Sequence, residues 1–152
     1  MNFMEWPIKR FYIVAVILGA LALLNSIAFR QKGVGVVFSI LLDLLMLATA
    51  YLAGSAARKA QRKSAWTSAG IGAVFGAFIG MAGFFIKFTA ANLGPHHYTP
   101  QEQHLLLTMA NSPTTHIFSL LLSIVLYGVL ALLIGALTSA LTKMPRNPKP
   151  PV

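Results

Sequence analysis

The chain has 152 residues, of which 57% are hydrophobic and only 10% are charged, and its formal net charge is +9. Soluble domains carry about 25% charged residues, so this composition excludes an ordinary water-soluble globular protein. The absence of cysteine excludes disulfides, thiolate metal sites and cysteine nucleophiles. The basic residues cluster beside the ends of apolar stretches, which indicates membrane orientation and no nucleic-acid partner.

Four apolar stretches are long enough to cross a bilayer, whose hydrocarbon core of about 30 Å requires about 20 helical residues. They predict an all-α membrane protein, an antiparallel four-helix transmembrane bundle formed by one domain over residues 1–143. A flexible basic, proline-rich tail over residues 144–152 is expected to follow it. The predicted spans cover about residues 11–29, 34–53, 66–91 and 116–141.

The first span admits a second interpretation. Lys9-Arg10, an apolar stretch and the small residues at Ser26-Ile27-Ala28 resemble a cleaved signal peptide. The apolar stretch is long for that role, so four spans remain the preferred prediction. Cleavage of residues 1–28 would leave three spans in the same orientation.

The distribution of basic residues predicts the orientation of the spans. Lys and Arg are retained on the cytoplasmic side of a membrane during insertion. Nine of the twelve basic residues lie on the side of the two termini and the second loop, and three lie on the opposite side. We therefore expect a protein of the cell membrane with both termini in the cytoplasm. The second loop carries the strongest signal, with Arg58, Lys59, Arg62 and Lys63.

The connection between the third and fourth spans contains its own helix signal. Thr99-Pro100-Gln101-Glu102 is a capping box with proline at the first helical position. We expect a short amphipathic helix from Pro100 to about Met109. Its leucines predict that it lies on the bilayer surface or covers the outer mouth of the bundle.

Small residues indicate where helices pack, because association in lipid depends on close backbone approach. The third span carries such a stripe, and the preferred interpretation is packing against another span of the same chain. Self-association, or docking of other membrane-protein chains through the same face, is the alternative. The stripe consists of Gly72, Gly76, Gly80 and Gly83.

Asp43 lies near the centre of the second span, where an ionised carboxylate costs on the order of 3 kcal/mol. It must therefore be paired, hydrated or protonated. Counting residues from the outer ends places Tyr127 at about the same depth, as the expected direct partner. Ser39, Ser123 and Asn25 lie nearer the outside.

Two interpretations of Asp43 follow. In one, it titrates or binds a cation at the end of a polar path from the outer mouth. In the other, it is protonated and hydrogen-bonds only to fix helix register. Such a path would be lined by Ser39, Ser123, Ser119 and His116. The outer-side polar candidates are His116, Lys87 and His104.

The sequence lacks a catalytic signature. It has no G-x-S-x-G, no H-E-x-x-H, no phosphate loop and no paired intramembrane aspartates. The outer-loop histidines show no recurring ligand spacing, so neither a metal site nor a cofactor is predicted, and an enzyme is not expected. The favoured hypothesis is an accessory or assembly subunit of a larger membrane complex. The alternatives are a small oligomeric transporter or ion/proton channel that uses Asp43, and a holin-like pore former.

Overall fold

The computed structural model describes residues 6–29, 33–94 and 97–141. Each of its four long helices has the length and apolar composition of a membrane span, so the predicted four-span helical bundle is confirmed. The predicted tail lies outside the described residues. The long helices are α1 (Trp6–Ala28), α2 (Gly33–Lys59), α3 (Ser64–Phe85) and α5 (Pro113–Leu141). Between α3 and α5 lie a 3₁₀ turn, η1 (Ala90–Asn92), and the short helix α4 (Pro100–Ala110).

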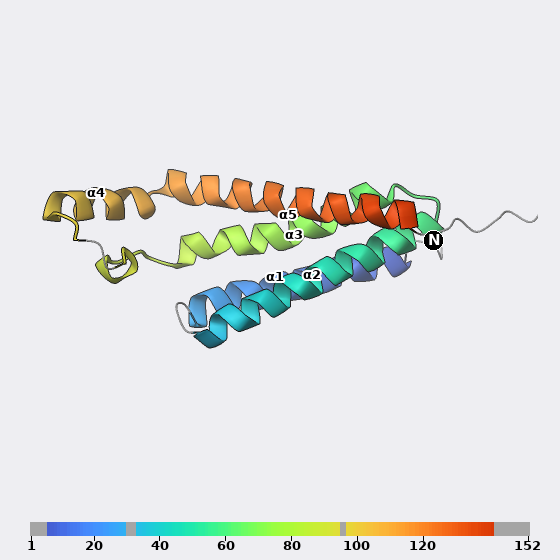
Figure 1. The fold of residues 1–152 in the computed structure, drawn as a ribbon, viewed down its shortest axis with the longest axis horizontal. Helices are drawn as coiled ribbons and strands as arrows, with labels where there is room; N and C mark the ends of the chain where they lie inside the picture. The colour runs from blue at the N-terminus through green and yellow to red at the C-terminus, as the bar shows by residue number, and fades with distance from the viewer. Residues whose placement is uncertain (1–5, 30–32, 95–96, 142–152) are drawn as a thin grey trace, which may run out of the picture.

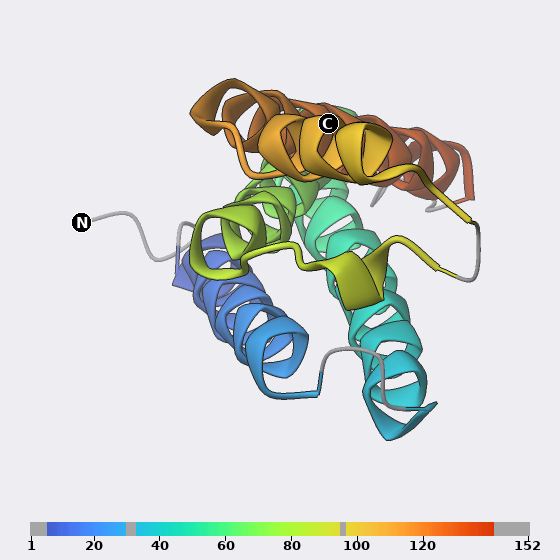
Figure 2. The same cartoon turned by 90° about the vertical axis from the view of Figure 1, so that its left-hand side faces the viewer.

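Helix α3 is the centre of the bundle. It contacts α1, α2 and α5, and its interface with α5 is the most extensive in the structure. Viewed from the end that carries α4, α3 lies between α5 and the α1–α2 hairpin (Figure 2). The α1–α2 hairpin and the hairpin formed by α3 and α5 meet at the end that carries the α2–α3 turn, here called the basic end. They diverge towards the opposite end, here called the α4 end (Figure 1).

Glycine allows α3 and α5 to touch backbone to backbone. A Cβ atom on Gly76 would lie 2.5 Å from the carbonyl oxygen of Ser123, and one on Gly80 would lie 2.5 Å from the Cα of Leu120. On the other helix, a Cβ on Gly135 would lie 2.7 Å from the Cα of Ala65. Side chains at these positions would force the helices apart.

The half of the bundle towards the basic end is closely packed. Met46 and Ala50 of α2 and Ile71 and Phe75 of α3 have no exposed surface. Ser68 Oγ donates to the carbonyl oxygen of Ala50 at 2.7 Å, which ties α3 to α2.

A second hydroxyl ties α3 to α5 in the same half. Ser64 Oγ donates to the carbonyl oxygen of Gly135 at 2.9 Å. In an apolar solvent such polar side chains need partners, and here the partners are backbone carbonyls of neighbouring helices.

Helix α2 extends beyond its predicted end near residue 53. Gly54 packs against α3, where an added Cβ would lie 2.6 Å from Ser68 Oγ, and Ala57 is fully buried. Packing therefore continues the helix past the apolar stretch. The chain then turns at Gln61, whose φ of 56° is left-handed, and the N–H of Arg62 donates to the carbonyl oxygen of Ala57 at 2.8 Å.

Helix α3 ends earlier than predicted, at Phe85 instead of near residue 91. Ile86 is extended, with φ −113° and ψ 117°. At Phe88, the side chain of Asn111 bonds the backbone groups that a longer helix would have bonded. Asn111 Oδ1 accepts from the N–H of Phe88 at 2.8 Å, and Nδ2 donates to the carbonyl oxygen of Phe88 at 2.9 Å.

The predicted short helix between the third and fourth spans is present as α4. Glu102 N donates to Thr99 Oγ1 at 3.3 Å, and Thr99 N donates to Glu102 Oε2 at 2.8 Å. The bond from the Thr99 backbone N–H, with one from its hydroxyl, lowers the pKa of Glu102. Helix α4 lies nearly in line with α5 rather than across the bundle, and it leaves Leu105 and Met109 exposed (Figure 1).

Matched glycine substitutions test the α3–α5 contact. Gly76→Ala should lower the free energy of unfolding by about 1–3 kcal/mol, because the added methyl meets the fixed backbone of α5. Gly128→Ala is the control, since its Cβ would have ordinary contacts of 3.8 Å. Unfolding of the detergent-solubilised protein, followed by circular dichroism, measures both. Equal stabilities of the two variants would contradict the contact.

Candidate functional site

The intramembrane acid is hydrogen-bonded across the bundle. Tyr127 Oη of α5 donates to Asp43 Oδ1 of α2 at 3.0 Å, and both residues are partly buried. The ring of Phe75, from α3, meets the Tyr127 ring edge to face, with 5.2 Å between centroids and 71° between planes. Because Phe75 is fully buried, it holds the tyrosine with its hydroxyl towards α2.

A second polar group lies one helical turn nearer the α4 end. Ser39 precedes Asp43 by four residues and so lies on the same face of α2. Asn25 of α1 donates from Nδ2 to Ser39 Oγ at 2.8 Å and to the carbonyl oxygen of Gly35 at 2.9 Å. These bonds close the α1–α2 hairpin with polar groups.

The side-chain carbonyl oxygen of Asn25, Oδ1, accepts no hydrogen bond from the described residues. Asn25 is only 4% exposed, and its Oδ1 is buried without a hydrogen-bond partner among the described residues. An unsatisfied buried acceptor costs about 1–3 kcal/mol. Because the atom is itself buried, a donor group of a ligand would reach it only after neighbouring side chains move.

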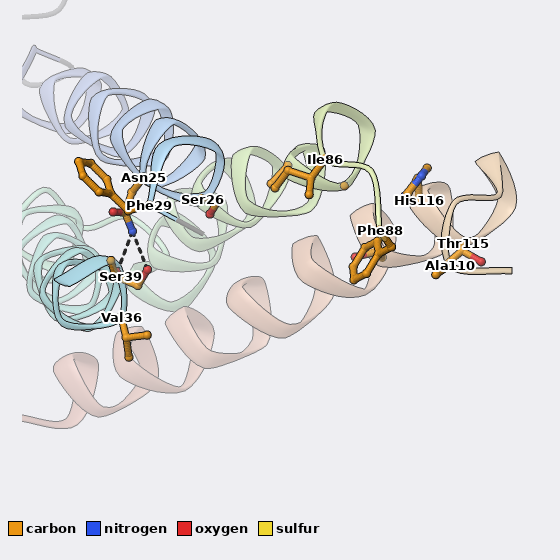
Figure 3. Close-up of a pocket in the computed structure, with 14 residues that line it drawn as sticks. Asn25, Ser26, Phe29, Val36, Ser39, Ile86, Phe88, Ala110, Thr115 and His116 are labelled. Carbon is orange, nitrogen blue, oxygen red and sulfur yellow. Dashed lines mark hydrogen bonds between the residues drawn. The ribbon is translucent and has the colours of Figure 1, made fainter. Parts of the chain in front are cut away.

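Asn25 and Ser39 line a pocket between the diverging hairpins, here called the α4-end pocket. Its volume is about 410 Å³, within the range of small-ligand sites. Apolar walls come from Phe29, Val36, Ile86 and Phe88. Figure 3 shows Asn25 and Ser39 at one side of the pocket and His116 and Phe88 at the other. The polar lining residues are Asn25, Ser26, Ser39, Thr115, His116 and Ser119.

The other predicted site residues are divided between this pocket and separate places. Ser123 contributes its backbone to the contact with Gly76 and does not belong to the pocket lining. Lys87 is exposed in the extended segment after α3. His104 lies on α4, in a separate shallow hollow with Leu105 and Thr108.

The predicted glycine stripe lies along α5, and its last member borders the pocket. A Cβ on Gly72 would meet the carbonyl oxygen of Tyr127, as Gly76 and Gly80 meet the next turns of α5. A Cβ on Gly83 would lie 3.0 Å from Nδ1 of His116. Gly83 thus leaves room for the imidazole, whose centroid lies 5.5 Å from that of the Phe84 ring.

Sequence reasoning missed two contributors to the pocket. Asn111 fixes Phe88 in the wall through its paired hydrogen bonds, and the Gly35 carbonyl binds Asn25. The run Asn111-Ser112-Pro113 indicated only the end of a helix. The acceptor role of Gly35 follows from tertiary placement, for which a sequence carries no local signal.

The pocket offers groups that can bind a ligand. They are hydroxyls and the imidazole of His116, with the Asn25 side chain beside them and a carboxyl group one helical turn further in. Towards the basic end, fully buried Met46 and Phe75 close the interior. Among the described residues, no three His, Asp or Glu side chains gather as a metal-ligand set.

Comparison with known proteins adds no relative to this description. No family model, no curated protein and no solved structure matches the chain.

A double-mutant cycle tests the bond between the second and fourth spans. Tyr127→Phe should destabilise the protein by about 1–3 kcal/mol, because it leaves a partly buried carboxyl group without its donor. In an Asp43→Leu background the same substitution should have little effect. The measurement is detergent-phase unfolding of the four proteins.

Tyr51→Phe is the control for this cycle. Tyr51 is on α2 as well but is 41% exposed. An effect of Tyr127→Phe that is the same with and without the Asp43 carboxyl group would show that the bond contributes nothing.

Proposed function

We propose that this four-span membrane protein is a small transporter or channel for protons or another small cation. One observation carries the proposal: a polar pocket opens at the α4 end and reaches Ser39, one helical turn from the Asp43–Tyr127 pair. Ionisable residues inside a span are costly, and they mark ion pathways and proton relays in membrane proteins. A cation is the expected cargo because the ionisable group in the span is a carboxyl group, whose charged form is an anion.

The asymmetry of the bundle supports the proposal. The hairpins diverge around the pocket at the α4 end, whereas Ser64, Ser68 and the small residue Gly54 close the other half. A transport cycle requires a second arrangement, with the pocket closed and the basic half separated. The Asp43–Tyr127 hydrogen bond lies between the two halves of the bundle, so it would be present in both arrangements.

The charge distribution supplies the direction. With the basic end at the cytoplasmic face of the cell membrane, the pocket opens to the outside. Asp43 then receives a cation from the outer side, through the pocket that His116 helps to line.

Flux into liposomes tests the proposal. Purified protein with a trapped pH-sensitive dye, under an imposed potential, should acidify the lumen faster than protein-free liposomes do. Asp43→Asn should return the rate to that of the protein-free control. Glu102→Gln makes the same chemical change on exposed α4 and should leave the rate unaltered.

The remaining outcomes of this experiment separate the alternatives. Flux that is unaltered in Asp43→Asn removes the residue from the pathway. Absence of flux for protons, Na⁺ and K⁺ removes the class. Release of a large trapped dye would instead indicate the holin-like pore former.

A second candidate is an accessory or assembly subunit of a larger membrane complex. The favouring observation is the surface of α5, which buries only Ala131, Gly135 and Thr138 along its length. Most of this span is therefore available to a helix of another chain. The glycine stripe of α3 is not available to another chain, because α5 already covers it.

Affinity purification in a mild detergent tests this second candidate. An accessory subunit should bring a second membrane protein with it in fixed stoichiometry. Elution as a lone monomer from its native membrane would contradict the assignment.

A further inference from the structure

The basic end of the bundle carries a second pocket, which the transport proposal does not use. Its volume is about 570 Å³, and it lies between the α2–α3 turn and the last turns of α5. We call it the basic-end pocket. Six of its lining residues matter here: Arg58, Gln61, Lys63, Ser64, Trp66 and Ser139.

The positive charge at this pocket has no sufficient counterpart within the chain. The protein has three acidic residues against twelve basic ones. Asp43 is near the middle of α2, and Glu102 is on α4 at the opposite end of the molecule. Glu5 lies outside the described residues and supplies at most one charge. An anion from outside the chain would therefore meet an excess of positive charge here.

Hydrogen-bond donors in the pocket also lack acceptors. Arg58 Nε is buried and has no hydrogen-bond partner among the described residues. Helix α3 begins at Ser64, and its N-cap residue Lys63 is extended and makes no side-chain cap. The first amide groups of a helix have no acceptor within the helix and favour an anion. The side chains of Arg58 and Lys63 and the first residues of α3 thus line one open pocket.

The pocket lies where a lipid headgroup would be. Trp66, in the first turn of α3, is 67% exposed, and tryptophan is enriched at the level of the headgroups. Beyond Trp66 the α3 surface enters the apolar span. A ligand with a charged head and an apolar chain would meet the basic residues and the span in that order.

We infer that the basic-end pocket binds the phosphodiester headgroup of an anionic phospholipid. Arg58 and Lys63 neutralise the phosphate, the uncapped start of α3 donates backbone N–H groups, and Trp66 covers the glycerol region. A phosphate that bridges Arg58 of α2 and the start of α3 also fixes the turn between them. The inference is independent of the transport proposal, since it concerns the other end of the bundle.

Native mass spectrometry of the detergent-solubilised full chain tests the site. Phosphatidylglycerol is titrated against the wild type and against Arg58→Gln/Lys63→Gln. The double variant should bind the lipid at least about tenfold more weakly, since each basic residue near an anionic headgroup contributes a factor of about five. Phosphatidylcholine should bind the wild type weakly and show no difference between the proteins.

The control is Lys9→Gln/Arg10→Gln, which removes the same charge at the same end but lies outside the pocket. Its affinity for phosphatidylglycerol should fall by a smaller factor than that of the pocket variant, because Lys9 and Arg10 supply only attraction to the lipid surface. Equal losses in both double variants would overturn the site and leave only surface attraction. Inorganic phosphate is the second arm: displacement of the lipid by an equal concentration would overturn the lipid assignment in favour of free phosphate.

Folding of the variants is checked by helix content and elution volume. Lys63→Gln alone changes an exposed residue and leaves the buried part of Arg58 intact. It should weaken binding of phosphatidylglycerol at least about threefold. An unchanged affinity of this folded single variant would also overturn the assignment.

Discussion

Helices in a bilayer gain little by burying apolar surface against one another, so their association depends on how closely their backbones approach. In this protein that constraint is met between α3 and α5. At Gly72, Gly76 and Gly80 of α3 the backbone of α5 approaches with no side chain between the helices, and at Gly135 of α5 the backbone of α3 does so. The rest of the bundle is arranged around this pair, because α1 and α2 pack on the other sides of α3.

The candidate site depends on the same contact. Close approach of α5 brings Tyr127 against the ring of Phe75 and directs its hydroxyl to Asp43 on α2. Towards the basic end, serine hydroxyls bond to carbonyls of neighbouring helices, and the interior is closed. Towards the α4 end the hairpins separate, and one buried oxygen of Asn25 has no hydrogen-bond partner among the residues that the structure describes. The closed interior at one end and the open pocket at the other give the bundle a direction.

Much of this architecture is predictable because it follows from local rules. Apolar length predicts the spans, the Thr99–Glu102 spacing predicts α4, and counting from the span ends places Tyr127 at the depth of Asp43. The helix ends are less predictable. Hydropathy reports the lipid-facing length, whereas packing of Gly54 decides that α2 continues. The Asn111–Phe88 contact joins residues 23 positions apart, so no periodic pattern reveals it. The pocket itself exists only through the angle between two hairpins.

The paired bonds of Asn111 have a mechanical consequence. They reproduce the pattern of a peptide group, and they connect the segment after α3 to the joint between α4 and α5. Thr115 Oγ1 donates to the Met109 carbonyl oxygen at 2.7 Å and stiffens that joint from the other side. Helix α4 is therefore fixed to the rim of the pocket by hydrogen bonds on two sides. A force applied to it outside the membrane, by a binding protein or a surface tether, is transmitted to the wall that holds Phe88 and His116.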